Sequence, residues 1–303
     1  MPSKREHKSR VKPLTFIGVP IDSVNPGGGN ERGPAALREL GLPAALGGED
    51  AGDLPVRIRG AERDPATGIL ASDDVLASTR TIRAAVAERI GAGARPFLAG
   101  GCCAELPGAL AGARDALGEV GLVHLDGHAD LYDGETSTSG EGADMPISVV
   151  LGLGPPAWVE ATGGAATSAE RTALVGFRDE EESRRDGMRQ PETLEPPPLL
   201  APGTELRARG HADCAAAIAA MLGDRGPFWL HFDVDVLDPA CFPATDYLQS
   251  GGLDWDELQA TLHPLLSSKR LVGASVACYN PDKDPHRDCG VALVEVLAAG
   301  CRA

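Results

Sequence analysis

The sequence predicts an α/β fold built around a parallel central sheet, with the ordered chain forming one domain over residues 13–303. Two observations carry this prediction. Short apolar runs alternate with segments of helical periodicity, which is typical of strand–helix–strand units. Two of those runs also end in acidic motifs of the same design, as expected where parallel strands meet a ligand. At 303 residues the chain can bury a sizeable core, as one large domain or two small ones.

The apolar runs and the helical patterns follow one another along the chain. The runs predict strands at Leu14–Val19, Pro96–Ala99, Gly121–Asp126, Thr172–Phe177, Phe228–Asp233 and Leu271–Ala277. The helical patterns cover Pro34–Glu39, Asp74–Ile90, Glu105–Leu117, Met145–Leu151, Gly210–Leu222, Asp254–Leu265 and Gly290–Ala299. Asp74–Ile90 is the clearest helix, because acidic residues favour a helix N-terminus and its apolar residues recur at helical spacing.

Two breaks interrupt this alternation. Ala161–Ala169 consists of small and polar residues, and Asp186–Thr204 contains a run of three prolines. We interpret both as surface loops rather than domain boundaries. Strands on both sides of them supply ligands to what looks like one site, which favours a single domain.

The charge and composition of the chain indicate which kinds of molecule it binds and where it is located. A net charge of −16 argues against nucleic acid and anionic membranes, and it is compatible with a cationic small-molecule substrate. Residues 1–12 are basic and lack the apolar segment of a signal peptide, so we expect a disordered tail. No apolar run is long enough to span a membrane. The seven cysteines show no zinc-finger or secreted-domain spacing, which favours reduced thiols in the cytoplasm.

Two motifs carry metal-ligating side chains on every second residue, directly after an apolar run. The first supplies Asp126, His128 and Asp130, and the second supplies Asp233 and Asp235. In extended backbone these side chains would point to one face. Four carboxylates meeting at one point would repel each other unless cations lay between them. Oxygen-rich ligation with a histidine suits Mn²⁺ or a similar divalent ion, and the charge is sufficient for two such ions.

At these residues the chain resembles the ureohydrolases, the family of arginase, agmatinase, guanidinobutyrase and formimidoylglutamase. The resemblance runs from about Ile17 onward. Beyond the acidic motifs, it rests on segments that fall in family order: Gly27-Gly28-Gly29, Arg32-Gly33-Pro34, Gly100-Gly101, Met145-Pro146, Gly176-Phe177-Arg178-Asp179, Leu237-Asp238-Pro239, Gly251-Gly252-Leu253 and Asn280-Pro281. It implies a three-layer α/β/α sandwich with a mostly parallel sheet, assembled as a homo-oligomer, a trimer or hexamer.

The resemblance also implies a ligand set and a reaction. Asp126 and Asp233 would bridge two metal ions, most simply Mn²⁺, while His128 and Asp235 would complete one shell. Asp130 would ligate the other ion and hold the attacking water, which makes it the expected catalytic residue. The implied reaction is hydrolysis of a C–N bond in a guanidino or amidino compound.

Three positions depart from the family pattern. Cys103 stands where the family has its remaining histidine ligand, and a thiolate favours Zn²⁺, Fe²⁺ or Co²⁺ over Mn²⁺. Ala143 replaces a proton-shuttling histidine, for which Asp144 or Glu141 could substitute. Cys278 replaces a glutamate that pairs with the substrate guanidinium. We therefore expect weak turnover of arginine and agmatine and a less basic substrate, such as a hydroxyguanidine or formimidoyl compound.

Other residues are assigned by position in the same resemblance. Ser139, Asp179 and Glu181, with Cys278, are expected to contact the substrate, although solvated loop residues would look the same. His124 and His231 are expected to lie beneath the metal ligands as supporting donors. Two alternatives remain: a catalytically silent relative that binds metal or ligand, and a mononuclear zinc hydrolase of the deacetylase type. Four ligand aspartates are more charge than one Zn²⁺ needs, which disfavours the latter.

Overall fold

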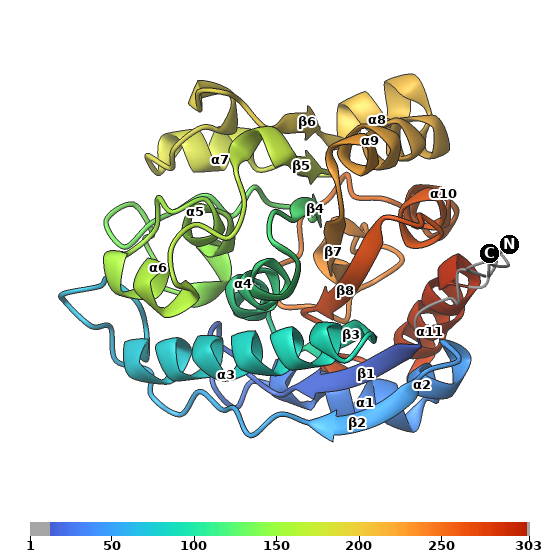
Figure 1. The fold of residues 1–303 in the computed structure, drawn as a ribbon, viewed down its shortest axis with the longest axis horizontal. Helices are drawn as coiled ribbons and strands as arrows, with labels where there is room; N and C mark the ends of the chain where they lie inside the picture. Colours follow the sequence, from blue (N-terminus) through green and yellow to red (C-terminus); the bar gives the residue numbers. More distant parts are fainter. Residues whose placement is uncertain (1–12, 302–303) are drawn as a thin grey trace, which may run out of the picture.

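Within residues 13–301, which the computed structural model describes, eight strands form one sheet in which every neighbouring pair is parallel (Figure 1). The expected basic tail lies outside the described residues. The strands are β1 (Leu14–Val19), β2 (Glu49–Asp53), β3 (Arg95–Gly100), β4 (Gly121–Leu125), β5 (Thr172–Val175), β6 (Leu199–Ala201), β7 (Phe228–Asp233) and β8 (Leu271–Ala277). Their order across the sheet is β2-β1-β3-β8-β7-β4-β5-β6.

Helices cover both faces of the sheet, which confirms the three-layer arrangement (Figure 1). One layer contains α3 (Ser72–Gly91), α4 (Leu106–Leu117), α5 (Pro146–Val150) and α6 (Pro156–Thr162). The other contains α1 (Gly33–Glu39), α2 (Leu42–Ala45), α8 (Gly203–Arg209), α9 (His211–Arg225), α10 (Trp255–Leu266) and α11 (Asp288–Cys301). The short helix α7 (Glu180–Arg185) follows β5.

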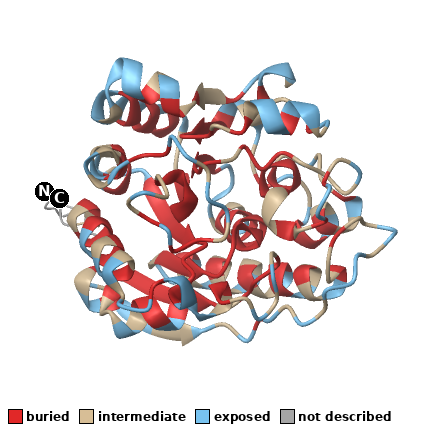
Figure 2. Cartoon of the chain, turned by 180° about the vertical axis from the view of Figure 1, so that it is seen from behind, coloured by how far each residue is buried: buried red, intermediate tan, exposed pale blue. Residues whose placement is uncertain are grey.

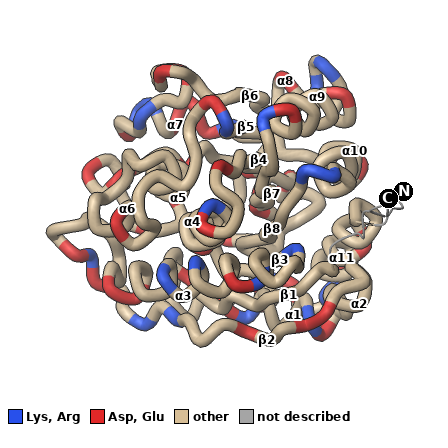
Figure 3. Tube along the Cα trace, in the orientation of Figure 1, with Lys and Arg blue, Asp and Glu red and all other residues tan. Residues whose placement is uncertain are grey.

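The core lies on the two faces of the sheet. Every residue of β4, β7 and β8 is buried, and the outer surfaces of the helices are the exposed parts (Figure 2). Strands buried on both faces need mostly apolar residues, which is why these segments appear as near-continuous apolar runs in the sequence. Basic and acidic residues are scattered over the outer helices and loops (Figure 3). Over residues 13–301, no helix combines the length and apolar character that crossing a membrane requires.

The two edge strands are the part of the sheet that the sequence did not predict. β2 has the sequence Glu-Asp-Ala-Gly-Asp, and β6 is a three-residue strand inside Asp186–Thr204, which we had interpreted as a surface loop. That interpretation is wrong for Leu199–Ala201. An edge strand pairs on one side only and is less enclosed, so it can form without a long apolar run. Ala161 and Thr162, assigned to the other loop, belong to α6.

Candidate metal centre

Four central strands, in the order β3-β8-β7-β4, end at the same edge of the sheet because they are parallel. The segments that follow them carry the predicted donors. Cys103 follows β3, and Asp126, His128 and Asp130 follow β4. Asp233 ends β7 with Asp235 just beyond, and Cys278 follows β8. All seven side chains line one pocket. The structure therefore brings the six predicted metal ligands together and adds Cys278 to them.

The acidic motifs reach this pocket by turns, so the expectation of extended backbone is wrong. The amide of His128 donates to Asp126 Oδ1 at 2.7 Å, and Asp130 has a left-handed φ of 50°. The amide of Asp235 likewise donates to Asp233 Oδ1 at 2.8 Å within a 3₁₀ turn, Val234–Val236. An aspartate readily accepts a hydrogen bond from the amide two residues on, which curls the chain and leaves both side chains on one side.

His128 lies among carboxylates. Its Nδ1 is 3.1 Å from Asp235 Oδ2 and 3.5 Å from Asp126 Oδ1. Asp235 is held in place from the first motif, because the amide of Gly127 donates to its Oδ1 at 3.0 Å. The guanidinium of Arg178 donates to the carbonyl of Asp235 at 2.8 Å and so fixes the second turn.

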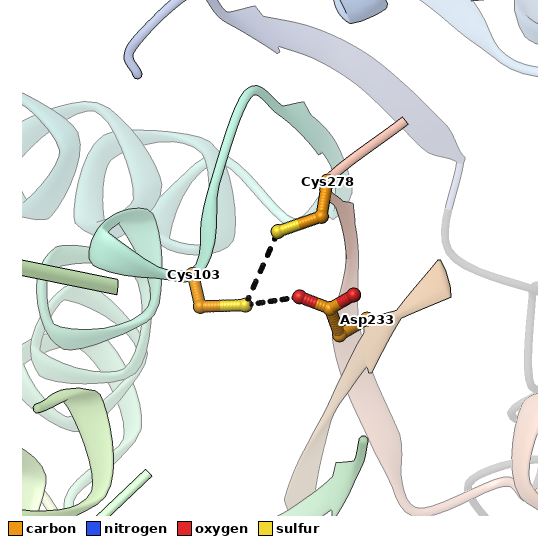
Figure 4. A group of neighbouring side chains, drawn as sticks. All are labelled: Cys103, Asp233 and Cys278. Atoms are coloured by element: carbon orange, nitrogen blue, oxygen red, sulfur yellow. Dashed lines mark hydrogen bonds between the residues drawn. The ribbon is translucent and has the colours of Figure 1, made fainter. Parts of the chain in front are cut away.

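Cys103 lies on the other side of the same carboxylates. Its Sγ is 2.6 Å from Asp233 Oδ2 and 3.9 Å from Asp126 Oδ2. Cys278 Sγ lies 3.8 Å from Cys103 Sγ, so two thiols and a carboxylate face one another (Figure 4). The loop that carries Cys103 passes close to the segment that follows β1 at Gly101, where a Cβ would lie 1.8 Å from the carbonyl oxygen of Ile21. Glycine is therefore required for the approach.

Two buried histidines lie beneath these donors, as their positions in the strands predicted. His124 and His231 are register partners on β4 and β7, and their rings stack at 5.4 Å with an interplanar angle of 5°. His124 Nε2 is 3.1 Å from Asp126 Oδ2 and 3.5 Å from Asp130 Oδ2. His231 Nδ1 pairs with the Ser275 hydroxyl at 2.8 Å, and its Nε2 has no hydrogen-bond partner.

Burial and mutual repulsion shift the pKa values of the clustered carboxyls. Burial raises the pKa of Asp130 to about 8, and the charge of Asp126 adds to this effect. Burial also raises the pKa of Asp233 well above its ordinary value, followed by the charges of Asp235 and Asp126. Asp126 is the exception: burial opposes its ionisation, but His124 and His128 hold its pKa well below the usual range. These carboxylates can all ionise together only if additional positive charge enters the cluster.

The donor set fits divalent metal ions. Overlapping groups of donor atoms lie within 4.8 Å of one another. One contains Asp126, His128 and Asp235, and another contains Cys103, Asp233 and Cys278. Asp126 also belongs to the groups that include His124 or His231, so it occupies the shared position between neighbouring sets. Carboxylate, imidazole and thiolate are ligands of Mn²⁺, Fe²⁺, Co²⁺ and Zn²⁺.

The pocket above the donors has a volume of about 160 Å³ and an acidic wall. Ser139 and Asp179 line it as expected, but Glu181 is exposed and is not among the lining residues. The neighbouring Glu182 lines it instead. The sequence also did not point to Asp186 and Tyr247 as lining residues. Neither lies in a motif, and Asp186 falls at the start of the segment that we interpreted as a loop.

The pocket offers an acid near the alanine that replaces the family histidine. Asp144 lines the pocket, and its Oδ2 accepts from Ser137 at 2.7 Å and Ser139 at 3.0 Å. Burial raises the pKa of Asp144 to about 7. Glu141 accepts a hydrogen bond from the hydroxyl of Tyr247, and burial raises its pKa as well. Both carboxyls can therefore hold a proton closer to neutral pH than an exposed carboxyl would.

Comparison with known proteins agrees with this geometry. The chain matches the arginase family model over residues 12–300. It is 26% identical to an arginase of Bacillus caldovelox over 297 residues, which cover 95% of this chain and 98% of that relative. The solved structure of Bacillus caldovelox arginase superposes with a TM-score of 0.84, covering 97% of this chain and 99% of the other. An N(omega)-hydroxy-L-arginine amidinohydrolase of Streptomyces lavendulae is 30% identical over 166 residues, covering 55% of this chain and 54% of that relative.

Proposed function

Because this chain belongs to the arginase family, we propose that it is a dinuclear-metal hydrolase that cleaves a C–N bond of a guanidino or amidino small molecule. The observation that carries the proposal is the meeting of two thiols, four aspartates and His128 in one pocket at the ends of four parallel strands. Bound divalent ions would lower the pKa of a bound water, which makes hydrolysis feasible near neutral pH.

We assign the residues of the pocket to metal binding, orientation of the attacking water and proton donation. The six residues that would hold the ions are Cys103, Asp126, His128, Asp130, Asp233 and Asp235. Asp130 accepts a hydrogen bond from the attacking water and orients it toward the central carbon of the substrate. The C–N bond then breaks as the leaving nitrogen takes a proton, and Asp144 is the group we assign to donate it. The products are an amine and urea, or a related small product.

The acidic wall supports a substrate with a positively charged tail. Asp179 is nearly fully buried, accepts a hydrogen bond from the amide of Ala129 at 3.3 Å, and leaves its Oδ1 without a partner. An ammonium group that reached this buried oxygen would satisfy it, and Glu182 lines the same pocket. Ser139 offers a hydroxyl to a polar group. Cys278 lacks the negative charge of a carboxylate, so a hydroxyguanidine or formimidoyl compound fits this pocket better than arginine or agmatine.

A product assay with defined metals tests the function. The chain is loaded separately with Mn²⁺, Fe²⁺, Co²⁺ and Zn²⁺ and offered guanidino, hydroxyguanidino, formimidoyl and amide substrates. We expect about two ions per chain and hydrolysis of at least one less basic amidine. Asp126→Asn should lower ion uptake and abolish turnover, whereas Asp213→Asn, on an exposed face of α9, should change neither.

The same experiment separates the enzyme from a catalytically silent relative, which the loss of the family histidine and glutamate would favour. Ion uptake without turnover of any substrate class would support a binding protein, and no uptake at all would contradict the metal assignment. Family membership also supports a cytoplasmic homo-oligomer, a trimer or hexamer. Sedimentation of the metal-loaded protein tests that assembly.

A further inference from the structure

Cys278 lines the pocket and also lies against the metal donors. Its Sγ lies 3.8 Å from Cys103 Sγ, and Cys103 Sγ lies 2.6 Å from Asp233 Oδ2 (Figure 4). Cys278 is 8% exposed and Cys103 is 2% exposed. Cys103 Sγ, Cys278 Sγ and a carboxylate oxygen of Asp233 all lie within 4.8 Å of one another, so Cys278 belongs to a group of donors that could hold a metal ion.

The backbone holds Cys278 in this position at a cost. Its φ is 68°, in the left-handed region that a cysteine rarely adopts, directly after β8. Such a conformation is sterically unfavourable and persists where the surroundings require it, often at functional sites. The amide of Cys278 donates to the carbonyl of Gly101 at 3.3 Å, which ties it to the loop that carries Cys103. The two thiols are thus fixed relative to each other by the backbone.

We propose that Cys278 is a metal ligand and that Cys103, Cys278 and Asp233 form a thiolate-rich position for Zn²⁺ or a similarly soft ion. This position lies beside a harder one formed by Asp126, His128 and Asp235. The inference rests on the proposed function only in requiring that the centre hold metal. It makes the two ion positions chemically different, because thiolates select softer ions and carboxylates with imidazole suit Mn²⁺.

The spacing of the sulfurs agrees with a shared ion. Two thiolates bound tetrahedrally at about 2.3 Å from Zn²⁺ lie roughly 3.8 Å apart. The two sulfurs have that separation in this structure. Entry of an ion would spread Cys103 and Asp233 from 2.6 Å to roughly 3.5 Å, which side-chain rotation allows. Each thiol releases its proton to solvent as the metal–sulfur bond forms, so the site gains two negative charges as it gains the cation.

Cobalt substitution reports the thiolates directly. Metal-free full-length protein, kept reduced, is titrated with Co²⁺ while bound metal and the near-ultraviolet thiolate-to-Co²⁺ absorption are recorded. We expect Cys278→Ser to lose about half of this absorption, Cys103→Ser to lose the other half, and each to weaken Zn²⁺ binding at least tenfold. The control is Cys102→Ser, whose thiol pairs with the Ser23 hydroxyl at 3.2 Å and is not among the donor groups. It should keep the full absorption.

The outcomes separate this inference from the proposed function. Full absorption in Cys278→Ser would overturn the ligand assignment, while metal uptake by the wild type would still support the hydrolase. Failure of the wild type to bind Co²⁺ or Zn²⁺ would overturn both. X-ray absorption of the Zn²⁺-loaded wild type needs no variant that could misfold. Two sulfur neighbours per chain at about 2.3 Å support the proposal, and one sulfur or none contradicts it.

Discussion

At the scale of single residues, two metal-donor candidates have an unusual backbone conformation. Within residues 13–301, four non-glycine residues have a positive φ, and two of them are donor residues: Asp130, in the segment after β4, and Cys278, directly after β8. The sequence predicted Asp130 from its motif, because residue type and spacing are local information. It could not predict that Cys278 meets Cys103, because the two are 175 positions apart and only the strand order brings them together.

The pH dependence of kcat/KM is the sharpest test of Asp144 as the proton donor. Its pKa is raised to about 7 by burial, so the protonated acid is present below that pH and is lost as pH rises through it. We expect the alkaline side of the kcat/KM profile to fall near pH 7. Asp144→Asn should lower the rate by roughly 10²–10⁴-fold and remove that fall. The measurement is kcat/KM from pH 5.5 to 9.5 with the substrate found in the panel.

The exposed Asp213→Asn variant should keep both the rate and the profile of the wild type in that series. An unchanged alkaline fall in Asp144→Asn would assign the proton donor to another group. Glu141, which also has a raised pKa, would then be the next to replace.

At the scale of elements, the sequence predicted the interior of the sheet better than its edges. The bounds of β1, β7 and β8 agree with prediction, because a strand buried on both faces must be mostly apolar. β2 carries three acidic residues and β6 follows three prolines, so neither has that pattern. Their pairing with β1 and β5 decides their structure. The sequence also did not predict the short helices α2, α6, α7 and α8. A helix of four to seven residues is too short to show a clear helical periodicity.

Helix α10 offers a local test of stability away from the pocket. Asp254 caps it by accepting from the amide of Glu257 at 2.8 Å, and Glu257 accepts from the amide of Asp254 at 3.1 Å. This reciprocal cap satisfies two otherwise unpaired amides. Asp254→Ala should lower the free energy of unfolding by about 1 kcal/mol. Urea unfolding should show a smaller loss for Asp256→Ala in the same helix turn, and equal losses would contradict a specific cap.

At the scale of the whole molecule, the proposed metal binding would be coupled to folding stability. The pocket gathers buried carboxylates from segments that are distant in the sequence, and their repulsion opposes the native state until cations enter. An ion at a hundred times its dissociation constant adds about 2.7 kcal/mol of stability. Chelation should therefore lower Tm by roughly 5 °C or more, and readdition of metal should restore it.

The Asp126→Asn variant gives the matching control for chelation. It lacks the carboxylate shared by the neighbouring donor groups, so its Tm should respond weakly to both chelator and metal. A wild-type Tm that chelation leaves unchanged would indicate that the centre holds no stabilising ion.

The central position of the last strand in the sheet has a consequence for biosynthesis. β8 inserts between β3 and β7, although it is made after both of them. A nascent polypeptide on the ribosome can thus expose Cys103 and both acidic motifs while the gap between their strands is still open. The group of Cys103, Asp233 and Cys278 cannot assemble until β8 closes that gap, so translation products that stop before β8 should lack this part of the centre.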